Sequence, residues 1–219
     1  MFVIGITGGI GSGKTTVSNI LSESGIKVIS ADQISRSVTA KDGIAIPELQ
    51  ETFGEEFIKD GALDRKLTAA LVFRNRKALD LLNRIVHRHV LDQMGEELDR
   101  LEDKRVKAVA LDVPIPVRQG FLDRCDVVFT VWADDEIRQK RLAKRGLSRS
   151  DALQRIAMQM SREEYREIAA AEIVNNGSID DLRRQVEDVI GVQLRERGIR
   201  YKSFLAAPEA TSEAESVQS

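Results

Sequence analysis

The chain has 219 residues, of which 42% are hydrophobic and 31% charged, and its net charge is −2. This length suits one α/β domain with an insertion, or two small domains. The near-neutral charge gives no reason to expect a nucleic acid or an anionic membrane as a partner, and no apolar run reaches the about 18 residues of a membrane span. A single cysteine cannot form an internal disulfide. We therefore expect a soluble, cytoplasmic protein that is a monomer or a weak homo-oligomer.

The first thirty residues predict a strand, a loop, a helix and a second strand. Residues 2–7 form a continuous apolar run, which is typical of a strand buried on both faces of a parallel sheet. From Lys14 the apolar positions recur at helical spacing as far as Gly25, a residue type that commonly follows the last turn of a helix. Residues 27–30 then predict a short strand that stops before Asp32.

Residues 33–104 are predicted to be mostly helical, with no convincing strand. Apolar residues three and four positions apart extend from Leu67 to Leu98, which predicts one or two amphipathic helices. The segment interrupts the alternation of strands and helices. We therefore interpret it as an insertion.

The sheet is expected to resume with two apolar, β-branched runs, residues 106–114 and 125–132. A charged helical stretch with a break near Gly146 follows. Residues 172–177 predict a last short strand and a turn, and Ser178 begins a final helix with a capping pattern.

A phosphate-binding pattern lies between the first strand and the first helix: Gly8-x-x-x-x-Gly13-Lys14-Thr15. Its glycines allow successive backbone N–H groups to turn inward around a polyphosphate. The Lys14 ammonium can then reach the β- and γ-phosphates, and the Thr15 hydroxyl can ligate Mg²⁺. The following helix points its positive N-terminus at the same anion. This context predicts a site for a nucleoside triphosphate.

Strands separated by helices predict a parallel sheet with right-handed crossovers. We expect a three-layer α/β fold of the P-loop NTPase type, with a five-stranded parallel sheet, a helical insertion that binds the acceptor, and a lid. The nucleotide-binding core is assigned to residues 1–32 and 105–199, with the lid at about 138–165. Residues 33–104 form the acceptor domain. Residues 200–219 are predicted to be a disordered acidic tail, since they offer little to bury.

Features outside the phosphate-binding pattern indicate which class of nucleotide-binding protein this is: a kinase, a switch GTPase or a motor. A switch GTPase would need a base-reading Asn-Lys-x-Asp segment, which the sequence lacks. A motor usually needs a longer chain and an apolar strand ending in Asp-Glu, whereas this strand ends in Asp112 alone. That residue is interpreted equally well as the polar end of a buried strand or as a distant Mg²⁺ contact. A small-molecule kinase needs an acceptor-binding insertion and an arginine-rich lid, and both have candidates here.

The candidate lid contains six basic residues, most of which are expected on a solvated helix face: Arg138, Lys140, Arg141, Lys144, Arg145 and Arg149. Arg141 and Arg145 are four residues apart, so on a helix they share one face. From that face they can clamp one polyphosphate.

Two strand ends carry candidates for the chemical step. Asp32 follows the second strand at the carboxyl edge of the sheet, where ligands of open α/β sheets bind. Its carboxylate can position or deprotonate an acceptor hydroxyl; capping the next helix is the structural alternative. Thr7 ends the first strand, where its hydroxyl either faces the transferring phosphoryl group or only completes the strand.

The sequence resembles the bacterial dephospho-coenzyme A kinases over nearly all of residues 2–192. The matching stretches, in order, include "ITGGIGSGKTTVSNIL", "LLNRIVHRHV", "RLAKRGLSRSDALQRIAMQM" and "NNGSIDDLRRQV". Members of this family phosphorylate the ribose 3′-hydroxyl of dephospho-CoA with ATP, which is the last step of coenzyme A biosynthesis. The resemblance implies the same substrates, with Mg²⁺ as the metal.

The resemblance also implies site residues. The catalytic positions of the family fall on Thr7, Asp32 and Arg141, with Lys14 in the phosphate loop. Nucleotide binding is expected at Gly9, Ile10, Gly11, Ser12, Gly13, Lys14, Thr15, Thr16, Arg145, Asn176 and Gly177, the last two near adenine.

Several positions depart from the family pattern, mostly on the acceptor side. Ser30 and Val174 stand where aspartate is usual, Arg88 replaces a proline, and residues 114–118 read Pro-Ile-Pro-Val-Arg instead of Pro-Leu-Leu-Phe-Glu. A related kinase for another nucleoside or sugar hydroxyl therefore stays open, as does a non-catalytic ATP-binding module. His87 is expected to be a packed or capping histidine. Two histidines and one cysteine offer no transition-metal site.

Overall fold

The centre of the molecule is a five-stranded parallel sheet in the order β2-β5-β1-β6-β7. The computed structural model describes residues 1–114 and 116–205; positions 206–219 of the predicted tail lie outside the described residues. The start of the tail at residue 200 was wrong, because Phe204 is fully buried in the core and Tyr201 packs against it. The strands are β1 (Phe2–Thr7), β2 (Lys27–Ser30), β5 (Ala108–Asp112), β6 (Val127–Trp132) and β7 (Ala171–Val174). The predicted fold class, a three-layer α/β fold around five parallel strands, is confirmed.

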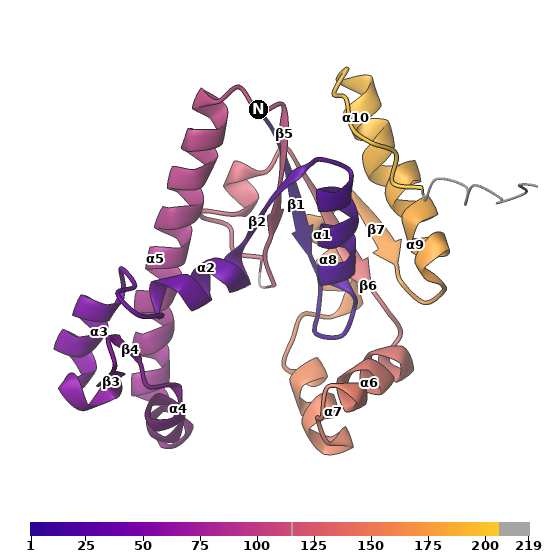
Figure 1. The fold of residues 1–219 in the computed structure, drawn as a ribbon. Helices are drawn as coiled ribbons and strands as arrows, with labels where there is room; N and C mark the ends of the chain where they lie inside the picture. Colours follow the sequence, from indigo (N-terminus) through magenta and orange to yellow (C-terminus); the bar gives the residue numbers. More distant parts are fainter. Residues whose placement is uncertain (115, 206–219) are drawn as a thin grey trace, which may run out of the picture.

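Helices cover both faces of this sheet (Figure 1). One face packs against α1 (Lys14–Glu23), α9 (Ile179–Val186), the π-helical turn η3 (Glu187–Gly191) and α10 (Val192–Glu196), and the other against α2 (Ala31–Val38) and α5 (Arg76–Asp103). Alternate side chains of β1 belong to different cores, Ile4 to the first and Val3 to the second. Because successive strand residues point to opposite faces, a run without polar residues can fill both cores.

The insertion between β2 and β5 contains a short hairpin that the sequence analysis missed. After α2, the insertion contains α3 (Ile46–Phe53), the 3₁₀ turn η1 (Glu55–Phe57), β3 (Ile58–Lys59), β4 (Ala62–Leu63), α4 (Arg65–Arg74) and the first part of α5. The hairpin is the antiparallel pair of β3 and β4. Strands of two residues are too short to show alternation. The Asp60-Gly61 pair between them, with φ of +53° and +79°, is the turn signal that could have revealed the hairpin.

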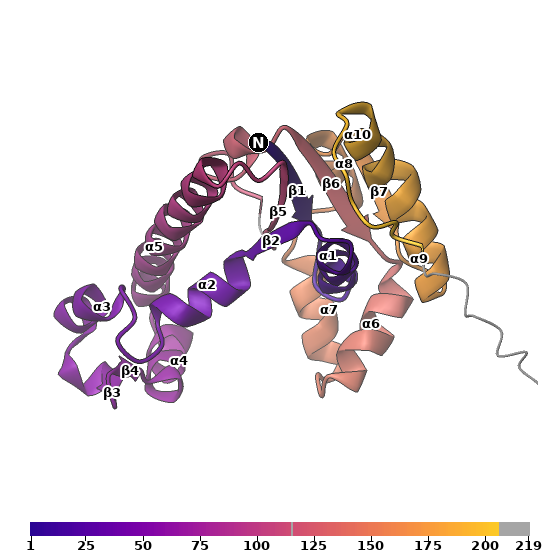
Figure 2. The same cartoon turned by 45° about the horizontal axis from the view of Figure 1, so that its top comes forward.

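Two parts of the chain extend from the same end of the sheet (Figure 2). From β2, α2 leads to the insertion; from β6 the chain enters α6 (Asp135–Lys144) and α7 (Arg149–Ala157), followed by α8 (Arg162–Ile168). The predicted break at Gly146 lies between α6 and α7. The capping box of Ser178 and Asp181 begins α9 as predicted. None of the helices in the described ranges is long and apolar enough to cross a membrane.

Candidate active site

The loop between β1 and α1 forms the wall of a cavity of about 250 Å³. Gly11 and Gly13 have φ of +78° and +97°, angles that residues with a Cβ rarely adopt. Thr15 is exposed at the start of α1 and lines the cavity, so its hydroxyl fits the role of a Mg²⁺ ligand beside a bound phosphate. The lining residues are Gly8, Gly9, Ile10, Gly11, Gly13, Lys14, Thr15, Asp32, Pro114, Arg145 and Gln159.

Lys14 forms a buried ion pair with Asp112 beneath this loop. The second oxygen of the Asp112 carboxylate accepts a hydrogen bond of 2.8 Å from Ser18 Oγ. Burial lowers the pKa of the Lys14 ammonium to about 8, against the opposing charge of Asp32. The contact with Asp112 favours the charged form of the lysine. To the two interpretations left open for Asp112, the structure adds a third: it is the counter-ion of the phosphate-loop lysine.

Arg138 is a buried side chain and not part of a solvated helix face, so the expectation for this residue was wrong. Only 2% of its surface is exposed. Its Nε donates to the Ile10 carbonyl at 2.9 Å, and its guanidinium stacks on Trp132 at 5.0 Å from the ring centre. Burial lowers the pKa of this guanidinium, and the charge of Asp135 opposes that shift. Helical spacing could not reveal this, because Ile10 and Trp132, which bury the side chain, lie outside its own helix.

Gln159, just after α7, completes this support of the phosphate loop. Its Oε1 accepts hydrogen bonds from the Ile10 N–H at 2.7 Å and from the Arg138 guanidinium at 3.1 Å. The sequence analysis did not single out this residue. No local pattern marks a glutamine that follows a helix, and its role depends on a contact across 149 positions of chain.

Arg141 binds the carboxyl-terminal half of the loop. Its Nη1 donates to the carbonyls of Gly11 and Ser12 at 3.2 and 3.0 Å, and its Nη2 donates to the backbone and side-chain oxygens of Asn175. The Asn175 amide in turn donates to the Ser12 carbonyl at 2.8 Å. Asn175 is thus a buried organiser of the site that sequence reasoning missed. Its position directly after β7 was the available signal.

A second cavity, of about 300 Å³, adjoins the loop on the side of α9. Gly177 lines it, whereas the Asn176 side chain accepts a hydrogen bond from the Asp134 N–H at 2.9 Å. Arg145 lines both this cavity and the phosphate cavity. The lining of the second cavity consists of Gly13, Thr16, Arg141, Arg145, Asn175, Gly177, Ile179 and Leu182.

Asp32 lies in the first turn of α2 with an exposed carboxylate. The helix cap is Ser30, whose Oγ accepts a hydrogen bond from the Gln33 N–H at 3.4 Å. The capping alternative for Asp32 is therefore wrong. With the cap supplied by Ser30, the Asp32 side chain remains free to face the phosphate cavity, which it lines.

Thr7 is fully buried at the end of β1, and its hydroxyl has no hydrogen-bond partner within the described residues. It is not among the residues that line the phosphate cavity. Because the Thr7 hydroxyl is buried and outside the cavity lining, a ligand can reach it only if the surrounding residues move.

A third cavity, of about 480 Å³, opens between α2 and α5 and is mainly apolar. His87 is exposed in the middle of α5 and lines this cavity, so it is neither packed nor capping. Pro114 and Val117 of the unusual segment also line it, while Arg118 is exposed and does not; position 115 lies outside the described residues. The substitution of a base for an acid at 118 therefore leaves this lining unchanged.

The sheet order, the glycine loop with its buried lysine, and the arginines of α6 define a P-loop kinase of small molecules. Within that class, the chain belongs to the dephospho-CoA kinase family: the family model described as "Dephospho-CoA kinase" matches residues 2–181. The family resemblance inferred from the sequence is thereby confirmed.

Relatives and solved structures agree with this assignment. The chain is 37% identical to a dephospho-CoA kinase of Corynebacterium glutamicum, covering 87% of this chain and 96% of that protein, and 38% identical to one of Latilactobacillus sakei, covering 94% and 99%. The crystal structure of TT1252 from Thermus thermophilus matches with a TM-score of 0.72 at 36% identity, over 87% of this chain and 97% of that one. A dephospho-CoA kinase from Campylobacter jejuni matches with a TM-score of 0.66 at 25% identity, over 90% and 98%.

Replacing Gly13 by alanine is expected to damage the loop beyond the cost of an unfavourable φ. A Cβ here would overlap the Asn175 amide, which would lose its bond to the Ser12 carbonyl. Gly25, with φ of +87° and no atom within 4 Å of the place a Cβ would take, is the matched control. We expect Gly25→Ala to cost about 1–2 kcal/mol of unfolding free energy and Gly13→Ala about 1–3 kcal/mol more, with weaker ATP binding. Equal losses in denaturant titrations would contradict this.

Proposed function

We propose that this chain transfers the γ-phosphoryl group of ATP to the ribose 3′-hydroxyl of dephospho-CoA, giving CoA and ADP. The observation that carries the proposal is the place of Asp32, whose carboxylate lines both the phosphate cavity and the apolar cavity between α2 and α5. In a chain of this family, that is where an acceptor hydroxyl must meet the γ-phosphate. Residues 33–104 would hold the acceptor and residues 138–165 would act as the lid.

In the proposed step, the acceptor oxygen forms a bond to the γ-phosphorus while the bond to the β,γ-bridging oxygen breaks. Asp32 orients the hydroxyl and accepts its proton, and ADP leaves with the bridging oxygen. Lys14 and the loop N–H groups neutralise the β- and γ-phosphates. Arg141 and Thr7 would contact the transferring group after the lid and loop adjust, and Arg145 would contact the polyphosphate.

Thr15 would hold Mg²⁺, which supplies charge neutralisation on the phosphate oxygens when bound. The adenine of ATP would occupy the cavity of about 300 Å³ beside Gly177, with Asn176 supporting the rim. A reducing cytoplasm suits a chain with one cysteine, and burial raises the pKa of its thiol to about 12.

The test is ATP- and Mg²⁺-dependent conversion of dephospho-CoA to CoA, identified by the mass of the product. Adenosine and other nucleoside or sugar hydroxyls serve as alternative acceptors in the same assay. Formation of CoA, lost in Lys14→Ala, supports the proposal. Tight ATP binding without transfer to dephospho-CoA would overturn it. The alternative of a different acceptor is not favoured, because the family match spans most of the chain.

Binding of MgATP is expected to take up protons from the buffer above pH 8. Burial holds the pKa of Lys14 near 8 in the free protein, and a polyphosphate beside the ammonium raises it. Between those two pKa values the complex holds more protons than the free protein, so protons are absorbed; at pH 7 the lysine is mostly charged in both states. Calorimetric titrations in two buffers of different ionisation enthalpy, at pH 7.0 and 8.5, measure the difference. Equal proton uptake at both pH values would contradict the prediction.

A further inference from the structure

A fourth cavity, of about 510 Å³, lies beside the apolar one, between α2, α4 and α5. The two share Asp32 and Ser35 on α2 and Asn83 and Val86 on α5. We call the fourth cavity the arginine groove; its lining is Asp32, Ser35, Arg36, Thr39, Leu63, Arg65, Thr68, Ala69, Val72, Leu82, Asn83 and Val86. The phosphate cavity, the apolar cavity and the arginine groove therefore meet at one carboxylate.

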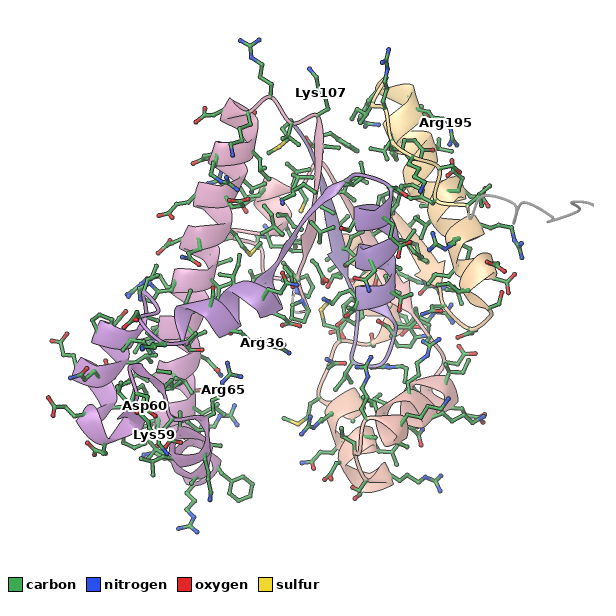
Figure 3. The ribbon with its side chains drawn as sticks, viewed as in Figure 1. Arg36, Lys59, Asp60, Arg65, Lys107 and Arg195 are labelled. Carbon is green, nitrogen blue, oxygen red and sulfur yellow. The ribbon has the colours of Figure 1, made fainter. Side chains whose placement is uncertain are left out.

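The arginine groove carries unneutralised positive charge. Arg36 comes from α2 and Arg65 from the start of α4, and both lie on the side of the insertion that faces α6 and α7 (Figure 3). Within residues 1–114 and 116–205, neither guanidinium makes a hydrogen bond or an ion pair. Arg88, on α5 of the same insertion, instead pairs with Glu48. The only carboxylate in the groove lining is Asp32.

A buried hydroxyl accompanies these two charges. Thr68, on the first turns of α4, is only 4% exposed, and its Oγ1 has no partner within the described part of the chain. Two free guanidiniums and an unpaired donor that line one cavity match the charge and the hydrogen-bonding capacity of a phosphate or diphosphate group, which accepts several hydrogen bonds at once. A neutral ligand would leave both guanidiniums without a counter-charge.

We propose that Arg36 and Arg65 bind the diphosphate bridge of the acceptor, so that the enzyme recognises a nucleoside 5′-diphosphate conjugate and not a nucleoside alone. The assignment rests on the proposed function. With the 3′-hydroxyl at Asp32, the ribose lies where the three cavities meet, and its 5′-carbon carries the diphosphate into the arginine groove. The apolar cavity, lined by Val90, Leu91 and Met94 among others, takes the adenine. The γ-phosphate approaches from the third side.

Arg36→Ala and Arg65→Ala test the assignment, with Arg74→Ala as a control on α4 that lies outside the groove. Loss of one charge-assisted contact should raise the KM for dephospho-CoA about 10- to 100-fold, with the KM for ATP and the melting temperature unchanged. Arg65→Lys should recover part of the loss. At saturating ATP, inorganic pyrophosphate should inhibit the wild type competitively against dephospho-CoA, and Arg65→Ala much less.

The outcomes separate this inference from the proposed function. If dephospho-CoA is phosphorylated and neither substitution raises its KM relative to Arg74→Ala, the diphosphate site is overturned while the function stands. If the wild type forms no CoA, the diphosphate site is tested by calorimetric binding of dephospho-CoA to protein saturated with a non-hydrolysable ATP analogue. If the wild type binds dephospho-CoA and Arg65→Ala binds it more weakly, the diphosphate site stands although the reaction does not. If both proteins bind it equally, or the wild type does not bind it, the diphosphate site is overturned as well.

Discussion

Asp32→Asn is expected to lower kcat for CoA formation by about 10²- to 10⁴-fold, the range typical of general acid–base catalysis. The amide keeps the size of the side chain but cannot accept the hydroxyl proton. The Kd for ATP should change by no more than about twofold, because Asp32 makes no hydrogen bond or ion pair with the loop, Lys14 or Arg141 within the described residues and acts on Lys14 only through its charge. Single-turnover rates and calorimetric ATP titrations measure the two quantities.

Asp92→Asn is the charge-matched control for this experiment. Asp92 is exposed on α5 and does not line the apolar cavity, the arginine groove or the phosphate cavity. Its kcat should equal that of the wild type. A kcat within tenfold of the wild type in Asp32→Asn would remove this carboxylate from proton transfer. A parallel loss of ATP affinity would instead indicate damage to the phosphate cavity.

Lys14→Ala is expected to lower kcat/KM for ATP by about 10²- to 10³-fold, as for the loss of one preorganised donor to a developing negative charge. The substitution also leaves Asp112 buried without its counter-ion, facing the phosphates. Breaking a buried pair by removing one partner typically costs about 3–5 kcal/mol of stability. Steady-state kinetics and denaturant titrations should therefore both show a loss.

The double variant Lys14→Ala/Asp112→Asn separates these two effects. Replacing the orphaned carboxylate by an amide should recover most of the lost unfolding free energy, because no buried charge remains. It should not recover kcat/KM, because the ammonium that neutralises the phosphates is still absent. Lys144→Ala, at the exposed end of α6, should change neither quantity. Recovery of activity in the double variant would show that Lys14 acts only as the partner of Asp112.

The strands of the five-stranded sheet and the phosphate loop were predictable because their signals are local. Residues 2–7 and 27–30 became β1 and β2 with the predicted bounds, since a strand buried on both faces needs a continuous apolar run. The capping box at Ser178 was likewise complete within four residues. Each of these signals lies inside one element and needs no knowledge of its neighbours.

The supports of the site were not predictable from local signals. Asp112 meets Lys14 across 98 positions, and Arg138 reaches Ile10 across 128. The burial of Arg138 depends on Trp132 and Gln159, which come from other elements. The local sequence of a charged helix does not indicate such distant partners, so helical spacing alone predicted that Arg138 would be exposed to solvent.

The sequence by itself determined the sheet, the phosphate grip and the family, because apolar runs, glycine spacing and the order of motifs are properties of short segments. The tertiary structure decided which charges are free to bind ligands. Within the described ranges, Asp32 and Arg65 have no side-chain partner and line the arginine groove. Arg138 and Asp112 instead bind residues of the phosphate loop, Ile10 and Lys14. That division follows from which segments the sheet brings side by side, and only folding sets those distances.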